Sequence, residues 1–303
     1  MKAATTVCPD ARAAAQTRFA DYLQLAKPRL SMMALFTVAA GALLAARGTP
    51  ADWTILLHAL FGSALVAVGA SALNQFYERD SDGFMSRTEN RPLPAGRLQP
   101  LEVLAFGAVL GIGGVTYLAV ALPHLLAAAL AALTFLSYVF VYTPLKRKTS
   151  LNTLIGAIPG ALPPVIGWAA VRGSLSLEIA VVFVILFLWQ VPHFLAIAWI
   201  YREDYSRAGL CMLPAVDGDG GMSSRQMVWY CLALIPASLA PVLLGRAGIP
   251  YLVTATILGA GFLAFALAFA RRRSLKRARG VLRASLIYLP VLLALLLLDG
   301  ASH

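Results

Sequence analysis

The chain has 303 residues, of which 59% are hydrophobic and only 13% are charged. Its mean hydropathy of +0.75 is far above that of a soluble domain of this length, so the composition excludes a soluble globular enzyme. The net charge of +11 is explained by membrane topology, because the basic residues gather in loops between apolar runs, and it requires no nucleic-acid partner.

The apolar runs recur at lengths of about 20 residues, enough to cross a hydrocarbon core of ~30 Å. They predict an all-α integral membrane protein in which residues 1–24 are a cytoplasmic N-terminal tail and residues 25–300 are a single membrane domain. Nine transmembrane helices are expected, at residues 30–46, 53–76, 102–121, 124–143, 151–171, 177–200, 227–245, 251–270 and 281–299.

The basic residues predict the orientation of these helices. Only Arg47, Arg172 and Arg246 fall in loops on one side of a nine-helix arrangement, and the other Lys and Arg residues fall on the opposite side. Because cytoplasmic loops are enriched in Lys and Arg, we expect a cytoplasmic N-terminus and an outside C-terminus in the cell inner membrane.

The most informative segment follows the second apolar run. Asn74, Glu78 and Asp82 are spaced at i, i+4 and i+8, so a continuing helix places them on one face. Arg87 and Arg91 come next. Oxygen ligands beside arginines are what a Mg²⁺-bound diphosphate needs, which predicts an enzyme whose diphosphate substrate keeps its apolar tail in lipid.

A second polar segment, WQVPHFLAIAWIYREDYSRAGLCMLP, covers residues 189–214 and emerges on the same predicted side. It contributes Asp204, which with Glu78 and Asp82 forms a sufficient carboxylate set for Mg²⁺, while Asn74 adds a neutral oxygen. The predicted diphosphate contacts are basic side chains near the cytoplasmic ends of the helices, namely Arg87, Arg91, Lys146, Arg147, Arg202 and Arg207.

These motifs resemble the UbiA-type prenyltransferase superfamily, whose N-x-x-x-D-x-x-x-D signature corresponds to Asn74, Glu78 and Asp82. The residues NQFYERDSDGFMSRTENRPLPAGRL, WQVPHF and REDYSRAGLCMLP are similar to one branch, the protohaem IX farnesyltransferases (haem O synthases). The chain departs from the superfamily pattern at Glu78, where aspartate is common, and in its second acidic motif, where Asp204 stands alone.

The resemblance implies a UbiA-type helix bundle around a central cavity and transfer of a farnesyl group from farnesyl diphosphate to a vinyl group of haem B. Water is added in the same reaction, and haem O and diphosphate are the products. It also implies Mg²⁺ as cofactor, and a downstream haem A synthase or terminal oxidase assembly as a candidate partner. Catalytic roles are expected for Asn74, Glu78, Asp82, Asp204 and His193.

His193 follows Pro192 within the sixth apolar run. Three roles are open for it: a ligand of the haem iron, a base or hydrogen-bond donor, and a structural residue. Tyr205 is a second candidate haem contact.

Two other functions compete with haem farnesylation. The chain could prenylate another acceptor, such as an aromatic quinone precursor. It could instead be a non-enzymatic haem transporter or an oxidase assembly factor, because buried polar residues in broken helices also occur in transporters.

Overall fold

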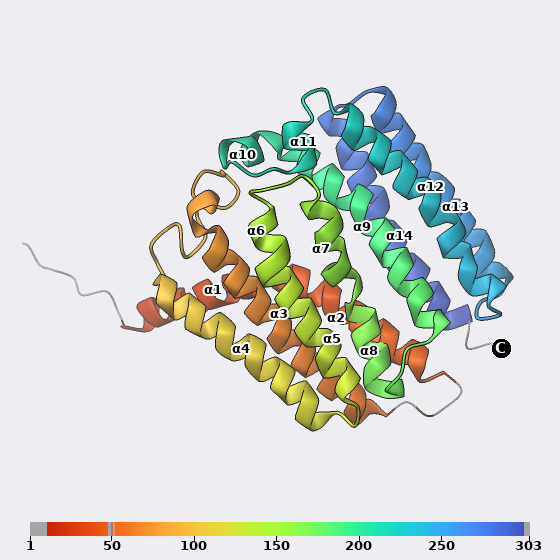
Figure 1. Cartoon of the computed structure of the whole chain (residues 1–303), viewed down its shortest axis with the longest axis horizontal. Coiled ribbons are helices and arrows are strands. Elements are labelled where there is room, and N and C mark those ends of the chain that lie inside the picture. The colour runs from red at the N-terminus through yellow and green to blue at the C-terminus, as the bar shows by residue number, and fades with distance from the viewer. Residues whose placement is uncertain (1–10, 48–49, 51, 300–303) are drawn as a thin grey trace, which may run out of the picture.

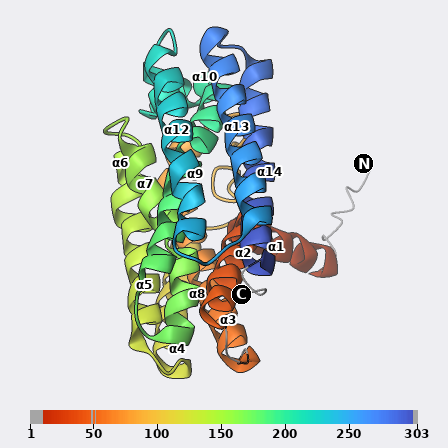
Figure 2. The same ribbon diagram turned by 90° about the vertical axis from the view of Figure 1, so that its right-hand side faces the viewer.

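The computed structural model describes residues 11–47, 50 and 52–299, and within these residues all regular structure is helical. The helices run side by side as a bundle, and α1 projects from its flank (Figures 1 and 2). In chain order the elements are α1 (Ala11–Ala26), α2 (Pro28–Ala45), α3 (Trp53–Asp82), α4 (Pro100–Ala121), α5 (Leu125–Leu136), the π-helical η1 (Ser137–Tyr142), α6 (Thr143–Leu145), α7 (Asn152–Ala161), α8 (Pro163–Arg172), α9 (Leu177–Ile200), α10 (Arg202–Arg207), α11 (Leu213–Val216), α12 (Gly221–Leu243), α13 (Ile249–Arg271) and α14 (Leu275–Asp299).

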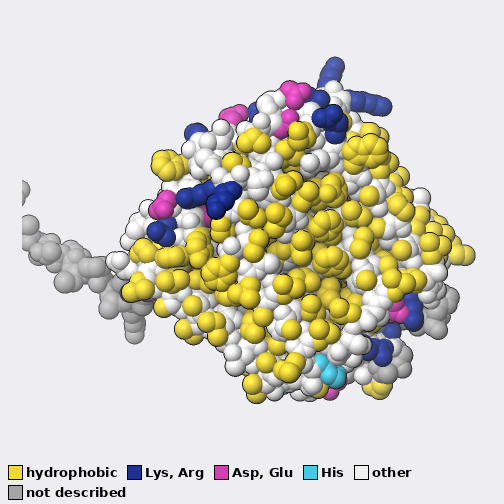
Figure 3. Space-filling model, in the orientation of Figure 1, with side chains coloured by type: hydrophobic (Ala, Val, Ile, Leu, Met, Phe, Trp, Pro, Cys, Tyr) yellow, Lys and Arg dark blue, Asp and Glu magenta, His cyan; other side chains and the backbone are white. Residues whose placement is uncertain are grey.

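Across the described residues, nine helical segments are long and apolar enough to cross a membrane, which confirms the predicted fold class. The fourth combines α5, η1 and α6, and the fifth combines α7 and α8. On the face shown in Figure 3, apolar side chains cover the middle and the charged side chains lie toward the edges. The protein is therefore a multi-pass integral membrane protein.

Three helices extend beyond the predicted apolar runs because polar residues continue them. α3 runs to Asp82, six residues past the predicted end. α12 begins at Gly221, where Asp217 accepts hydrogen bonds from the backbone and hydroxyl of Ser223. α14 begins at Leu275, and the Ser274 hydroxyl accepts a hydrogen bond from the Arg277 backbone N–H at 3.4 Å. Such caps satisfy the free donors at a helix start.

The predicted N-terminal tail, residues 1–24, contains most of α1, and its residues 1–10 lie outside the described part of the chain. Tyr22 packs on Phe106 of α4 with ring centroids 4.8 Å apart. Arg97 donates to the Asp21 carboxylate at 2.7 Å. These contacts hold α1 against α4 and the segment that precedes it, beside the end of the bundle where α3 finishes.

Glycines allow two helices of the bundle to approach closely. A Cβ on Gly41 of α2 would lie 1.9 Å from the Pro164 carbonyl oxygen of α8, and a Cβ on Gly167 would lie 1.9 Å from the Val38 carbonyl oxygen. Small residues at helix contacts are the usual way to bring backbones together in a membrane. The close contact between α2 and α8 therefore stabilises this side of the bundle.

Candidate active site

The last turns of α3 carry the predicted polar face. Asn74, Glu78 and Asp82 are only 1%, 8% and 0% exposed, and α3 is one continuous helix of 30 residues, so the three side chains lie on one face. Burying two carboxylates and an amide is unfavourable unless they have partners.

Each of these three side chains contacts a different cation. The Lys146 ammonium donates to Glu78 Oε1 at 2.5 Å, and Arg91 Nη1 donates to Asp82 Oδ2 at 2.5 Å. The Lys27 ammonium donates to Asn74 Oδ1 at 2.9 Å.

These residues line one open cavity at the end of the bundle where α3 finishes. The cavity contains about 650 Å³ of empty space, a figure that includes its open mouth. Its walls combine acids, cations, aromatic rings and apolar side chains, namely Lys27, Leu30, Asn74, Glu78, Asp82, Met85, Arg87, Arg91, Tyr138, Tyr142, Lys146, Tyr205, Leu210 and Met212.

The aromatic wall comes from the π-helical segment η1. Tyr138 and Tyr142 have ring centroids 5.4 Å apart, and the Lys146 ammonium lies 4.5 Å from the centroid of the Tyr142 ring. A π-helical turn changes the register of the side chains and is frequent at functional sites. Gly156 of α7 makes room for this wall, since a Cβ there would lie 2.5 Å from the Tyr142 ring.

Arg87 is held over the cavity mouth by two tyrosines. Its guanidinium carbon lies 4.8 Å from the centroid of the Tyr201 ring, and Nη2 donates to the Tyr205 hydroxyl at 3.2 Å. No carboxylate pairs with Arg87 among the described residues. Its charge is therefore available to an anion.

The two lysines of the cavity have opposite pKa shifts. Burial lowers the pKa of Lys27 to about 7, and the nearby positive charge of Arg91 adds to this effect. Burial would also lower the pKa of Lys146, but Glu78 and the Tyr142 and Tyr138 rings raise it above its ordinary value. Lys27 also has a left-handed backbone, with φ of 45°, which is strained for a residue with a side chain.

The pKa of Lys27 predicts a pH-dependent capture of an anionic substrate. The protonated form attracts a diphosphate, and this form is lost as the pH rises through about 7. We expect kcat/KM for the diphosphate substrate to fall between pH 7 and 8, and Lys27→Arg to shift this fall to a higher pH, since arginine stays charged. A pH profile of kcat/KM for both proteins checks this, and coincident profiles would contradict it.

The cavity has the oxygen donors that a divalent cation requires. Asp82 Oδ1 is buried and has no hydrogen-bond partner among the described residues. Asn74 Oδ1 accepts one hydrogen bond and has a second lone pair. Carboxylate and amide oxygens are ligands that Mg²⁺ prefers, and substrate phosphates with waters complete its shell. The donor set therefore fits Mg²⁺, although the described residues contain no group of three acidic, histidine or cysteine side chains able to hold a metal alone.

The predicted second motif lies beside the cavity. Three of its residues, Tyr205, Leu210 and Met212, are in the lining. Asp204 accepts from the Ser86 hydroxyl at 3.2 Å and pairs with Arg207. Arg202 pairs with Glu203 at 3.2 Å and stacks on Trp199.

Arg147 is exposed and, like Asp204, Arg202 and Arg207, is absent from the cavity lining. The structure thus assembles Asn74, Glu78, Asp82 and their cations, and leaves these four residues outside the lining.

His193 lies in α9 and is also outside the cavity lining. Its ring stacks on Trp189 with centroids 4.9 Å apart, and Nδ1 is 2.8 Å from the Ser285 hydroxyl of α14. Trp189 in turn donates to the Ser285 backbone carbonyl at 2.8 Å. His193 is thus fixed between α9 and α14.

Several lining residues were not among the sequence-based candidates. Lys27 was used only to predict the orientation of the helices, although the sequence shows it as a cation directly before the first apolar run. Tyr138 and Tyr142 are spaced at i, i+4 inside an apolar run, where tyrosine is also common as packing.

The described part of the chain is a membrane-embedded helical bundle with acids, cations and a metal-compatible donor set at one end. A solved structure of digeranylgeranylglyceryl phosphate synthase has this fold, with a TM-score of 0.79 at 18% identity, covering 95% of this chain and 100% of that one. A UbiA homologue from Archaeoglobus fulgidus bound to GPP and Mg²⁺ has a TM-score of 0.63 at 16% identity, covering 93% and 98%.

The chain belongs to the UbiA prenyltransferase family, whose profile matches residues 34–293. It is similar to a protein named protoheme IX farnesyltransferase from Solibacter usitatus, with 49% identity covering 92% of this chain and 98% of that one. A protein of the same name from Myxococcus xanthus is 45% identical, with 92% and 94% covered. The predicted family and branch are confirmed.

Proposed function

We propose that the protein transfers the farnesyl group of farnesyl diphosphate to a vinyl group of haem B, with addition of water, to give haem O and diphosphate. The acceptor follows from relatives that are 41–49% identical over most of the chain and are named protoheme IX farnesyltransferase. The observation that supports the chemistry is the buried Asp82 Oδ1, which has no partner among the described residues and lies in a cavity with four cationic side chains.

The cations of the cavity bind the diphosphate. Lys146 and Arg91, which pair with Glu78 and Asp82 in the free protein, also contact substrate phosphates, and Arg87 and Lys27 add two further positive groups. Asp82, Glu78 and Asn74 are the proposed holders of Mg²⁺. When bound, this ion supplies charge neutralisation of the diphosphate leaving group. A UbiA homologue was solved with GPP and Mg²⁺, which is consistent with this arrangement.

The outer residues of the predicted diphosphate set have supporting roles in this proposal. Arg207 neutralises the charge of Asp204. The Asp204 carboxylate also accepts a hydrogen bond from the hydroxyl of Ser86, the residue before Arg87. Arg202 and Arg147 contribute positive potential near the mouth. Asp204 joins the metal shell only if it leaves Arg207, because in this structure its carboxylate is engaged there.

Ionisation begins when the bond between the farnesyl carbon and the diphosphate oxygen breaks and both electrons remain on oxygen. The cations stabilise the developing negative charge, and the faces of Tyr138 and Tyr142 stabilise the allylic cation. The vinyl π electrons of haem B then form the new carbon–carbon bond. Water adds to the resulting cation beside the porphyrin and loses a proton. The apolar bundle keeps bulk water from the allylic cation until this bond forms.

Only one ring nitrogen of His193, Nδ1, has a hydrogen-bond partner among the described residues. The Ser285 hydroxyl donates its proton to the Leu282 carbonyl at 2.7 Å, so it accepts a hydrogen bond from His193 Nδ1–H. Nε2 then carries a lone pair. We propose that this lone pair binds the haem iron and that Tyr205 contacts the haem edge nearest the cavity. The competing role for His193 is to remove a proton from the added water.

His193→Ala is expected to abolish the haem absorbance change on titration with haem B, while farnesyl diphosphate binding stays intact. Ser285→Ala, which removes the group that orients His193, is expected to weaken haem binding about tenfold. Absorbance titrations of both variants check this. Unchanged spectra in His193→Ala would exclude iron ligation and leave the proton-accepting role.

We propose that the cavity opens to the cytoplasm and that the protein lies in the cell inner membrane. Arg47, Arg172 and Arg246, the three basic residues predicted to be outside, lie at the end of the bundle opposite the cavity. This segregation follows the positive-inside rule. A haem A synthase or a terminal oxidase assembly is the proposed recipient of the product.

A product assay tests the proposed reaction. Membranes with the protein are incubated with haem B, farnesyl diphosphate and Mg²⁺, with and without EDTA, and the haem is analysed by mass spectrometry. We expect a haem that carries a farnesyl group plus water only without EDTA. Released diphosphate with unchanged haem would point to another acceptor, such as a quinone precursor. If the assay yields neither product, the result would favour a haem transporter or assembly factor.

A further inference from the structure

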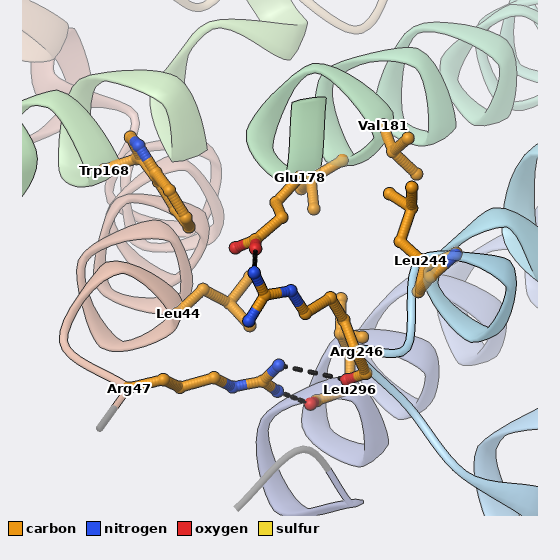
Figure 4. A pocket seen from close by; sticks show the side chains of 10 residues that line it. Leu44, Arg47, Trp168, Glu178, Val181, Leu244, Arg246 and Leu296 are labelled. Carbon is orange, nitrogen blue, oxygen red and sulfur yellow. Dashed lines mark hydrogen bonds and ion pairs between the residues drawn. The ribbon is translucent and has the colours of Figure 1, made fainter. Parts of the chain in front are cut away.

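A second pocket lies at the end of the bundle opposite the diphosphate cavity. It is formed where α2 and α14 end and α9 begins, together with the α12–α13 connection (Figure 4). The 24 residues of α9, at 1.5 Å each, separate the two ends by about 36 Å. This pocket therefore lies outside the site proposed for farnesyl transfer.

The pocket has an apolar wall and a charged mouth. Its enclosed space is small, about 20 Å³, and the pocket is open at the mouth. Arg47, Arg246 and Glu178 provide the charges, and the remaining lining residues are apolar or aromatic, namely Leu44, Trp168, Val181, Val182, Pro241, Leu244 and Leu296. An apolar wall that ends in charged groups at the end of membrane-spanning helices matches the polarity of a lipid between its acyl chains and its headgroup.

Arg47 offers one hydrogen-bond donor that has no partner among the described residues. Its Nη1 and Nη2 donate to the backbone carbonyls of Arg246 and Leu296, as Figure 4 shows. Its Nε is buried and has no partner among the described residues. A buried donor without an acceptor is unfavourable, so the guanidinium is fixed in place with one N–H available to an anionic oxygen.

Arg246 and Glu178 add one charge of each sign at the mouth. They form an ion pair whose side chains are 57% and 28% exposed, so both groups are accessible at the pocket mouth. Arg172 donates to the carbonyls of Ala45 and Arg47 behind them and keeps the Arg47 backbone in place. A ligand with an anionic and a cationic group can satisfy Arg47 and Glu178 together.

We propose that this pocket binds a phospholipid with a phosphoethanolamine headgroup from the adjacent leaflet. The phosphate accepts from Arg47 Nε and from Arg246, the ammonium pairs with Glu178, and the start of the acyl chains packs on Leu244 and Val181. The proposal does not depend on the reaction assigned to the other end of the bundle.

Native mass spectrometry of the delipidated full-length protein tests the proposal by titration with phosphatidylethanolamine and phosphatidylglycerol, which share a phosphate but differ in the ammonium. We expect about a tenfold preference for phosphatidylethanolamine. Arg47→Gln should lower the affinity for both lipids about tenfold, and Glu178→Gln should remove the preference only. Arg271→Gln, an exposed arginine at the other end of the bundle, is the matched control and should leave both affinities unchanged.

Equal binding of the two lipids by the unmodified protein would overturn the proposal. So would an unchanged affinity in Arg47→Gln, or the same loss in Arg271→Gln. If Arg47→Gln does not fold, Glu178→Gln decides the question, because it keeps the size of the side chain: a retained preference for phosphatidylethanolamine in that variant contradicts the assigned site.

Discussion

Asp82→Asn is expected to lower kcat/KM for farnesyl diphosphate by about 10³-fold, equivalent to ~4 kcal/mol of transition-state stabilisation. The substitution keeps the shape of the side chain but removes the negative charge. Asp82 is fully buried, its Oδ2 pairs with Arg91, and its Oδ1 has no partner among the described residues. Both the proposed Mg²⁺ contact and the position of Arg91 are affected. Steady-state kinetics with varied farnesyl diphosphate measure the loss.

Asp80→Asn is the matched control for this substitution. Asp80 lies two residues away on the exposed side of α3, where it pairs with Arg79 at 3.6 Å. Its removal is expected to leave kcat/KM within twofold of the unmodified protein. Near-normal activity of Asp82→Asn, in protein that remains folded in the membrane, would contradict the metal-ligand role. Equal losses in both variants would indicate a general disturbance of α3.

Lys146→Met is expected to lower kcat/KM by about 10²-fold or more. The lysine contacts Glu78 at 2.5 Å and lies over the Tyr142 ring, so its loss removes a phosphate contact and leaves Glu78 without its cation. Breaking one partner of a buried pair is also strongly destabilising. Kinetics and thermal unfolding separate the two effects.

Glu78→Gln combined with Lys146→Met is expected to recover part of the lost thermal stability without restoring activity, because it removes the uncompensated buried carboxylate. Lys148→Met is the control, since Lys148 is exposed two residues away and should have little effect on either quantity. An active Lys146→Met variant would contradict the proposed diphosphate contact.

The sequence was sufficient to predict the nine membrane-spanning segments, because runs of about 20 apolar residues are rare outside membrane-spanning helices. It also predicted the shared face of Asn74, Glu78 and Asp82, which depends only on helical periodicity. The structure adds the partner of each residue. Those partners come from the residue before α2, the residues after α6 and the loop after α3, and contacts between such distant segments have no signature in local spacing.

The second motif shows where sequence patterns are insufficient. The predicted topology placed Asp204, Arg202 and Arg207 at the same end of the bundle as the first motif, but Asp204 and Arg207 of α10 pair with each other outside the cavity lining. The aromatic wall was missed for a related reason. Tyr138 and Tyr142 gain their orientation from the π-helical register of η1, and an apolar run gives no sign of a local change in helical register.

The most direct test of the proposed site is a structure with Mg²⁺ and the non-reactive analogue farnesyl thiodiphosphate. We predict a metal ion at about 2.0–2.1 Å from Asp82 Oδ1, with the diphosphate between Arg91, Lys146 and Arg87 and the farnesyl chain beside Tyr138 and Tyr142. A diphosphate bound away from α3, with Asp82 still without a ligand at Oδ1, would contradict the central claim.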